Sequence, residues 1–291
     1  VLLWLEGMTF YDAINHALTT MATGGFSTKN ASIAFYDVPV IQYTIMLFMF
    51  IAGINYTVTY FALTGRFKKV WASDEFKAYI VFVFLIIAIV AFGIGSFHGY
   101  TVEESLRYAG FQVLSMITTT GYVVVDYTQW SYFLTLLFFL LLFMGACAGS
   151  TSGGIKIIRH LVFLKNTILE FKRLMHPSAL IRTKIDKRLV PAKVMTHILV
   201  FLMIYLFTFM IGSLFMAYIF NDWDEPLLTA VGAVATSLGN VGPAIAELGP
   251  ADNFSAVPIV GKWFLSFLML LGRLELFTIL ILFTPYFWRA N

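Results

Sequence analysis

The chain has 291 residues, of which 59% are hydrophobic and 12% charged, and its mean hydropathy is +0.83. This composition excludes a soluble globular domain and predicts an integral membrane protein. A single cysteine, Cys147, excludes a disulfide framework and a thiolate metal cluster, and a net charge of only +3 gives no indication of nucleic-acid binding.

Five apolar stretches are long enough to cross about 30 Å of hydrocarbon as helices, at about 1.5 Å per residue. None of them alternates apolar and polar residues with a period of two, so membrane barrel strands are excluded. In chain order, the predicted spans are roughly residues 39–64, 77–98, 129–164 (interrupted), 193–220 and 256–288.

A short polar segment recurs three times between these stretches, as A-T-G-G-F at 22–26, T-T-T-G-Y at 118–122 and T-S-L-G-N at 236–240. Each copy follows a short helix-like stretch with an acid near its start. A helix that ends half way through the membrane and returns as a Thr/Gly-rich strand builds a cation selectivity filter, because backbone carbonyls replace the ion's water. One copy alone is usually a turn, but three copies in register favour a filter. The predicted cation-binding residues are Thr23, Gly24, Gly25, Thr119, Thr120, Gly121, Ser237, Leu238, Gly239 and Asn240.

The repeated unit is an outer helix, a re-entrant pore helix, a filter strand and an inner helix. The predicted fold class is therefore an all-α integral membrane protein with a pseudo-fourfold, potassium-channel-like pore. We expect a truncated repeat at 1–70, a complete repeat at 71–175, a basic cytoplasmic linker at 176–192 and a complete repeat at 193–291. A carbonyl-lined filter needs roughly fourfold coordination. We therefore expect the chain to be a fragment whose fourth quarter lies in missing N-terminal sequence.

A Gly/Ser-rich string, G-A-C-A-G-S-T-S-G-G-I-K at 145–156, interrupts the inner helix of the 71–175 repeat. Non-helical backbone at membrane depth is tolerated only where protein or a water-filled cavity surrounds it. Beneath a filter, such a loop can obstruct the pore and move aside. We favour this gate over a packing kink, for which one or two glycines would be enough. The predicted gate residues are Gly149, Ser150, Thr151, Ser152, Gly153, Gly154 and Lys156.

Arg273 lies near the middle of the last apolar stretch. A buried arginine there costs about 2.5–3.5 kcal/mol, and such residues usually mark a transport pathway. Glu275 is only two residues away and therefore lies on a different helix face, which makes it a poor partner. Two roles stay open for Arg273: an electrostatic element beside the cation path, or a structural clamp on the filter and gate loops.

The distribution of charge predicts the orientation in the membrane. Fifteen of the 19 Lys and Arg residues lie at 66–77, at 156–193 and at Arg289, whereas the opposite loops hold 11 of the 16 acids. Because basic loops stay in the cytoplasm, we expect the filter loops outside and the C-terminus in the cytoplasm. An acidic outer mouth would also concentrate cations. The basic linker is either a docking segment for a partner or an ordinary cytoplasmic loop.

The strings A-T-G-G-F-S-T, T-T-T-G-Y, G-S-T-S-G-G-I-K, S-L-G-N-V-G-P and G-R-L-E-L-F-T, in this order, resemble the superfamily of K⁺ transporters that includes Trk, Ktr and HKT proteins. The last two look most like its bacterial TrkH branch. The resemblance covers the whole chain and implies four pseudo-repeats, of which this chain is the C-terminal part. It further implies a homodimer regulated by a cytoplasmic ring of nucleotide-binding, TrkA-like subunits. By this likeness the filter glycines are Gly25, Gly121 and Gly239, the gate is 149–156, and Arg273 is the pore-proximal arginine.

The residues and the resemblance together predict potassium uptake across the bilayer of a bacterial inner membrane, with K⁺ as the transported ion and no organic cofactor. A sodium-permeable or sodium-coupled relative is the alternative within transport. The alternative from another class is a membrane-embedded enzyme or sensor. No nucleophile elbow, phosphate loop or H-E-x-x-H motif occurs, so we expect no enzyme.

Overall fold

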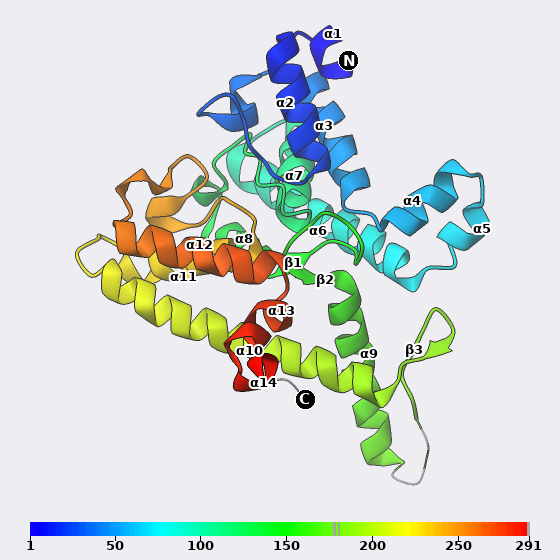
Figure 1. Cartoon of the computed structure of the whole chain (residues 1–291). Coiled ribbons are helices and arrows are strands. Elements are labelled where there is room, and N and C mark those ends of the chain that lie inside the picture. Colours follow the sequence, from blue (N-terminus) through cyan, green and yellow to red (C-terminus); the bar gives the residue numbers. More distant parts are fainter. Residues whose placement is uncertain (177–178, 180, 290–291) are drawn as a thin grey trace.

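The computed structural model describes residues 1–176, 179 and 181–289. Residues 177, 178 and 180 of the predicted linker and the last two residues of the predicted C-terminal repeat lie outside the described residues. The described chain is built almost entirely from helices, with two short two-stranded ladders (Figure 1). Its elements form three groups in chain order, centred on the short helices α2 (Phe10–Met21), α7 (Val102–Ile117) and α11 (Pro226–Gly239).

The first group contains the elements around α2. Thr9 caps α2, because its side chain accepts the backbone N–H of Asp12. Pro39 opens the next long helix at a position where no backbone N–H is needed. The remaining elements of this group are α1 (Leu2–Leu5), a 3₁₀ turn (Ser32–Phe35), α3 (Pro39–Ala52), α4 (Tyr56–Leu63) and α5 (Phe67–Val70).

The second group surrounds α7. A capping box starts this helix, since Thr101 accepts the N–H of Glu104 while the Glu104 carboxylate accepts the N–H of Thr101. The other elements are α6 (Asp74–His98), a 3₁₀ turn (Tyr127–Gln129), α8 (Tyr132–Leu141), β1 (Met144–Gly145), β2 (Ile155–Lys156) and α9 (Ile157–Met175). β1 and β2 pair in parallel, so the end of the loop between them lies beside its start.

The third group surrounds α11. Its long outer helix, α10 (Ala192–Ile219), follows an antiparallel hairpin made of β3 (Lys184–Ile185) and β4 (Arg188–Leu189). The inner side is formed by α12 (Ile259–Arg273), which packs closely on α11: a Cβ at Gly272 would lie 1.9 Å from the carbonyl oxygen of Leu238. The remaining elements are 3₁₀ turns at Ala246–Leu248, Phe254–Ala256 and Ile281–Phe283, and the helices α13 (Leu276–Leu280) and α14 (Pro285–Trp288).

Two of the predicted spans are single straight helices, α6 and α10. The stretch 39–64 is instead bent by 109° between α3 and α4, and the last stretch is bent by 115° between α12 and α13. The first bend occurs at Gly53 and Asn55, where the Asn55 side chain caps α4 by accepting the N–H of Thr57. The second occurs at Glu275, which has a positive φ of 62°. At the first bend the gate segment satisfies backbone groups, since the carbonyl of Gly53 accepts the N–H of Cys147 at 3.1 Å and the N–H of Tyr56 donates to the carbonyl of Gly149 at 3.2 Å.

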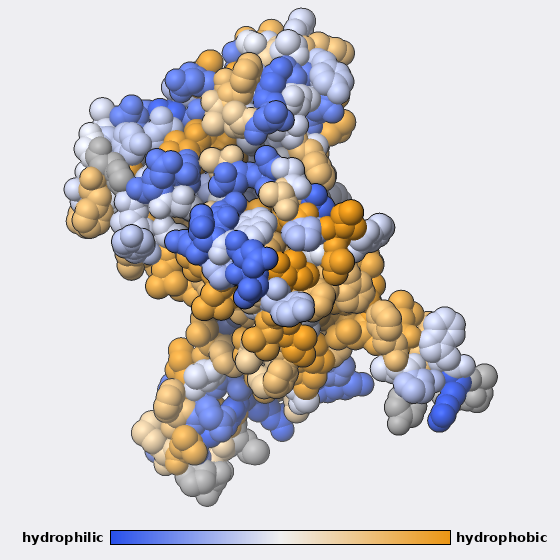
Figure 2. All heavy atoms as spheres, turned by 90° about the vertical axis from the view of Figure 1, so that its left-hand side faces the viewer, coloured by the Kyte–Doolittle hydropathy of each residue, from blue (hydrophilic) through white to orange (hydrophobic). Residues whose placement is uncertain are grey.

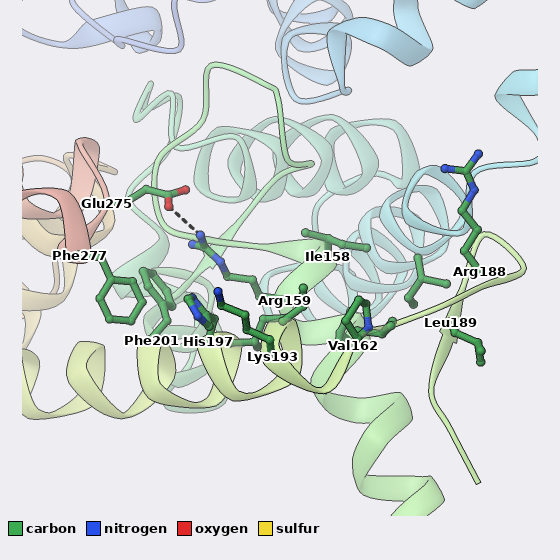
Figure 3. A pocket seen from close by; sticks show the side chains of 15 residues that line it. Ile158, Arg159, Val162, Arg188, Leu189, Lys193, His197, Phe201, Glu275 and Phe277 are labelled. Atoms are coloured by element: carbon green, nitrogen blue, oxygen red, sulfur yellow. Dashed lines mark hydrogen bonds and ion pairs between the residues drawn. The ribbon is translucent and has the colours of Figure 1, made fainter. Parts of the chain in front are cut away.

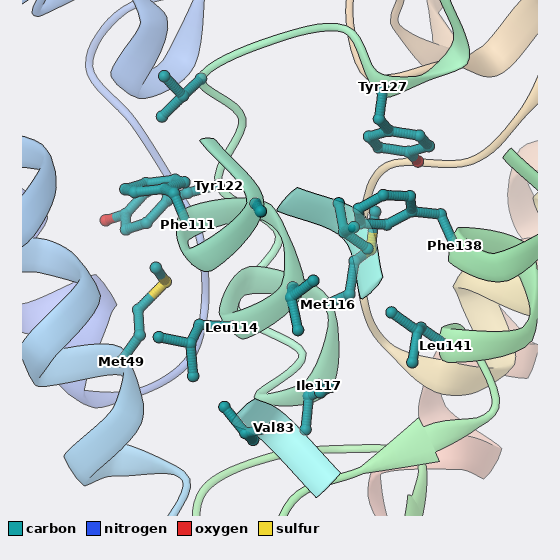
Figure 4. Close-up of a cluster of buried hydrophobic side chains, with 14 of the residues drawn as sticks. Met49, Val83, Phe111, Leu114, Met116, Ile117, Tyr122, Tyr127, Phe138 and Leu141 are labelled. Atoms are coloured by element: carbon teal, nitrogen blue, oxygen red, sulfur yellow. The ribbon is translucent and has the colours of Figure 1, made fainter. Parts of the chain in front are cut away.

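The helix α7 lies at the centre of the hydrophobic core. Figure 4 shows Met116 and Ile117 of α7 between Met49 of α3, Val83 of α6 and Leu141 of α8, all of them buried. In a bilayer, such contacts contribute mainly through van der Waals packing, since lipid tails are as apolar as the side chains. The core therefore fixes α7 from three sides and with it the segment that follows its C-terminus.

The long outer helices α6 and α10 also carry apolar side chains on the surface of the molecule. Phe84 and Phe92 of α6 and Phe207 and Leu214 of α10 are exposed in the described chain. Figure 2 shows apolar side chains at the surface across the lower middle of one face, between hydrophilic groups above and below. This pattern is that of a membrane protein whose helices face lipid.

Candidate ion pathway

The three short helices α2, α7 and α11 are each followed by the same backbone turn. A residue in the left-handed region comes first, and two residues later a glycine also has a positive φ, a conformation that glycine adopts without steric cost. The pairs are Thr23 (φ 48°) and Gly25 (φ 64°), Thr119 (φ 53°) and Gly121 (φ 81°), and Asn240 (φ 56°) and Gly242 (φ 115°). We call residues 23–25, 119–121 and 240–242 the first, second and third pore turns.

The third pore turn corrects the predicted register. Ser237, Leu238 and Gly239 lie in the last turn of α11, so the counterpart of Gly25 and Gly121 is Gly242. Aligning T-S-L-G-N with T-T-T-G-Y assumes that the preceding helices end at the same position of the motif, but α11 continues to Gly239. A Cβ at Gly239 would lie 2.4 Å from the carbonyl oxygen of Leu142, so this glycine is required for packing against the end of α8.

Neighbouring pore turns approach each other through their backbones. A Cβ at Gly25 would lie 1.8 Å from the carbonyl oxygen of Thr120, and one at Gly121 would lie 2.0 Å from that of Val241. Real Cβ atoms do not come this close to backbone, so both positions require glycine for space as well as for φ. For a Cβ built at Gly242, the nearest atom is the Cα of Gly121, at 3.8 Å. The pore turns therefore follow one another in chain order, and the described chain leaves the third open on its far side.

Two tyrosine hydroxyls connect the second group of helices to the first and to the third. The hydroxyl of Tyr122, directly after the second pore turn, shares a hydrogen bond with Thr19 on α2, while its carbonyl accepts from Ser115 at 2.6 Å. Tyr127 is fully buried and donates to the carbonyl of Ala244, after the third pore turn, at 2.6 Å. These bonds fix the three turns relative to one another without using the backbone groups of the turns themselves.

The loop between β1 and β2, residues 146–154, contacts all three repeats, and we call it the gate loop. The N–H of Gly153 donates to the Thr119 hydroxyl of the second pore turn at 2.6 Å. Thr151 donates to the carbonyl of Met21, at the end of α2, at 3.2 Å. A Cβ at Gly153 would lie 2.7 Å from the carbonyl oxygen of Gly239. The predicted gate segment is therefore packed directly against the ends of the three pore helices.

Two residues that were not predicted as functional from the sequence form hydrogen bonds to the gate loop at Ala148. The buried carboxylate of Glu75 accepts the N–H of Ala148 at 2.6 Å, and the side chain of Asn55 donates to the carbonyl of Ala148. Asn55 lies in the break between α3 and α4. In sequence, Glu75 is the second of two acids at the start of an apolar span and is indistinguishable from an ordinary helix-start acid.

The predicted gate residue Lys156 turns back onto the loop, where its ammonium group bonds the carbonyl and the hydroxyl of Ser152. Beneath the loop lies a cavity of about 320 Å³ that Lys156, Arg159, Arg273 and Glu275 line together with residues 149–154. Three basic residues and one acid thus surround the space on the side of the gate loop away from the pore turns. This arrangement disfavours a cation in that space by charge repulsion.

Arg273 is not buried within a span, as predicted, but lies at the C-terminal end of α12, where its side chain is exposed in the described chain. Among the described residues it makes no hydrogen bond or ion pair. Glu275 is not its partner, as expected, because the break after α12 turns Glu275 towards α9, where it forms an ion pair of 2.8 Å with Arg159. Arg159 in turn lies over the ring of Phe201 on α10, at 3.9 Å from its centroid. The structural tie between repeats is therefore formed by Arg159.

The acids at the starts of the pore helices are engaged in local structure. A hydrogen bond from Thr28 lowers the pKa of Asp12 to about 2, and Lys29 lies 3.6 Å from its carboxylate. Glu104 is held in the capping box of α7. Glu225 precedes α11 without a side-chain capping bond. Asp12 and Glu104 are thus ionised at neutral pH, but their first role is to start helices.

Comparison with known proteins gives a consistent result. The family model described as TrkH, cation transport protein, matches residues 3–86 and 79–289. The Trk system potassium uptake protein TrkH of Escherichia coli K12 is 39% identical over 289 residues, and the TrkH of Vibrio parahaemolyticus is 38% identical over 294. The crystal structure of the potassium transporter TrkH from Vibrio parahaemolyticus superposes with a TM-score of 0.90 at 37% identity, covering 98% of this chain.

The matches extend along nearly the whole of this chain but only part of the relatives. The chain spans 59% of the length of the two TrkH proteins and covers 61% of the solved chain. Both the resemblance read from the five motifs and the predicted membrane fold class are confirmed. The chain belongs to the TrkH family of cation transport proteins.

Proposed function

We propose that this chain forms three quarters of a pore for potassium uptake, with the gate loop as its obstruction. The single observation that carries the proposal is the shared geometry of the pore turns. Three short helices are followed by turns with the same pattern of positive φ angles, and neighbouring turns approach each other through carbonyl oxygens and glycines. Backbone carbonyls brought together in this way can replace the hydration shell of a monovalent cation. The proposed cation-binding segments are 23–25, 119–121 and, in the corrected register, 240–242.

The fourth quarter is proposed to come from another part of the same protein. The open side of Gly242 supports this, because a ring of carbonyls would otherwise be incomplete. With it we propose the division into repeats at 1–70, 71–175 and 193–291. A homodimer and a cytoplasmic, TrkA-like nucleotide-binding ring remain proposals from the family resemblance; the basic linker 176–192 is the proposed docking segment.

The proposed location is a bacterial inner membrane, with the pore turns opening outside and the C-terminus in the cytoplasm. The basic stretches 66–77 and 156–193 support this orientation. Inward movement of K⁺ would then be driven by the membrane potential, at about 2.3 kcal/mol per charge and 100 mV. Glu275, which is paired with Arg159, is the one acid among the residues that line the gate cavity, so this lining offers no carboxylate pair for ion coupling.

Rubidium flux tests this proposal. The protein, completed with an upstream segment carrying a fourth pore repeat, is reconstituted in vesicles, and flux is measured with and without excess sodium. We expect rubidium and potassium to compete and sodium to compete weakly. Equal competition by sodium would favour the sodium-permeable alternative, and absence of any flux from a folded protein would favour a membrane-embedded enzyme or sensor. Robust flux by residues 1–291 alone would contradict the fourth quarter.

A further inference from the structure

A second cavity lies away from the pore turns, where α9, the β3–β4 hairpin, the start of α10 and α13 meet (Figure 3). Its volume is about 660 Å³, within the range of pockets that hold small molecules. Its walls are largely apolar and include Val162, Ile198, Phe201 and Phe277. It shares Arg159, Phe201 and Glu275 with the cavity beneath the gate loop, so the two spaces are neighbours.

The cavity carries an excess of positive charge. Arg159, Arg188 and Lys193 line it, whereas Glu275 is its one acid. Arg159 is already occupied by Glu275, at 2.8 Å, and by the ring of Phe201. Within the described part of the chain, the side chains of Arg188 and Lys193 make no hydrogen bond or ion pair. Positive charge beside an apolar wall therefore lacks a counter-charge from the described protein.

Lys193 and His197 are placed to act together. They are four residues apart on α10 and therefore on one helix face. Figure 3 shows both side chains in the same part of the cavity as Arg159, whereas Arg188 projects at its far end. Lys193 is the second residue of α10, a 28-residue apolar helix that is about 42 Å long at about 1.5 Å per residue. Since the hydrocarbon core is about 30 Å thick, the first turns of α10 lie at the depth of lipid headgroups.

We propose that this cavity binds the phosphate group of an anionic phospholipid, with Lys193 and His197 donating to phosphate oxygens. The apolar walls formed by Ile198, Phe201 and Phe277 would contact the glycerol and the first acyl carbons. A soluble phosphate would use the cations but leave these walls without a partner, which is why the lipid is favoured. The inference requires that α10 crosses the membrane and does not depend on which ion the pore carries.

Native mass spectrometry of the intact protein in detergent tests the site. Phosphatidylglycerol is titrated against zwitterionic phosphatidylcholine, and glycerol 3-phosphate is added as a soluble competitor. We expect selective retention of phosphatidylglycerol that the soluble phosphate does not displace. The double variant Lys193→Gln/His197→Gln should weaken retention at least about fivefold, since one basic residue near an anionic surface contributes about that factor. Lys172→Gln is the matched control, because Lys172 is exposed on α9 but does not line the cavity.

Four results would overturn the proposal: equal retention of phosphatidylcholine, complete displacement by glycerol 3-phosphate, an unchanged affinity in the double variant, or an equal loss in the Lys172 control. The second result would identify a soluble phosphate as the ligand. A photoreactive residue at Val194, which is exposed and lines the cavity, provides a test in the otherwise unaltered protein. It should form an adduct with the mass of phosphatidylglycerol in membranes, and a lack of any lipid adduct would contradict the site.

Discussion

The second and third pore turns share a backbone conformation but are held in different ways. In the second, the hydroxyls of Thr118 and Thr120 bond each other at 2.8 Å, and a Cβ built at Gly121 would lie 2.0 Å from the carbonyl oxygen of Val241. In the third, a hydroxyl from inside α11 accepts the N–H of Gly242 at 2.9 Å, and no backbone atom lies within 3.4 Å of a Cβ built there. The positive φ values are thus the requirement that both turns share, while close backbone contact distinguishes the second turn from the third.

The largest expected effect distinguishes a steric clash between two pore turns from backbone strain at a position with a positive φ. In Gly121→Ala the new Cβ meets the Val241 carbonyl, so the two turns must move apart, and we expect loss of discrimination against sodium together with most of the uptake. Gly65→Ala is the matched control, because Gly65 has a similar φ of 72° but nothing within 4 Å; it carries only the strain of about 1–3 kcal/mol. Gly242→Ala should fall between them. Uptake with and without excess sodium is the measurement, and equal behaviour of the Gly121 and Gly65 variants would remove Gly121 from the filter.

The next effect concerns the contact between the second turn and the gate loop. Thr119→Val removes the acceptor of the Gly153 N–H and should raise flux in the absence of regulatory partners, by about fivefold for a buried hydrogen bond of about 1 kcal/mol. Replacing residues 150–154 by alanines should raise it further. Thr118→Val is the control, because this hydroxyl bonds Leu114 and Thr120 and not the loop. Unaltered or lower flux in folded Thr119→Val protein would favour a packing kink.

A third prediction compares two arginines beside the gate cavity. Arg159→Gln removes the partly exposed pair with Glu275 and the stacking on Phe201, and should lower the free energy of unfolding by about 1–2 kcal/mol. Arg273→Gln should change stability by less than about 0.5 kcal/mol while altering flux, since Arg273 has no partner in the described chain. Thermal unfolding and flux are measured on both variants. A larger loss of stability in the Arg273 variant would make that residue the structural clamp.

The smallest effects should come from the tyrosine ties. Tyr127→Phe leaves the Ala244 carbonyl without its buried donor and should cost about 1 kcal/mol. Tyr122→Phe removes a hydroxyl that bonds Thr19 and should cost no more. Both are read from thermal unfolding, with rubidium retention as a second measure. If Tyr122→Phe destabilised the protein far more than Tyr127→Phe, the first and second repeats would be more tightly coupled than the second and third.

The starts of the pore helices were predictable because their signals are local. The predicted acid near the start of a short helix lies in the first turn of α2, as Asp12, and of α7, as Glu104. The break in the inner helix could be predicted for a similar reason, since a run of glycines and small hydroxyl residues cannot continue a helix. By contrast, the roles of Glu75 and Asn55 were not visible, because each bonds a backbone group more than seventy residues away.

The sequence by itself determined that the chain is a helical membrane protein with repeated Thr/Gly turns, because hydropathy, capping patterns and glycines act over a few neighbouring residues. Only the tertiary structure decided which glycine belongs to the third turn, since the end of α11 is set by its packing against α8 and α12. It also decided that Glu275 pairs with Arg159 and leaves Arg273 exposed, because the bend between α12 and α13 cannot be read from a stretch that hydropathy predicts as one span. Contacts between repeats depend on how whole helices are placed, and no short stretch of sequence encodes that placement.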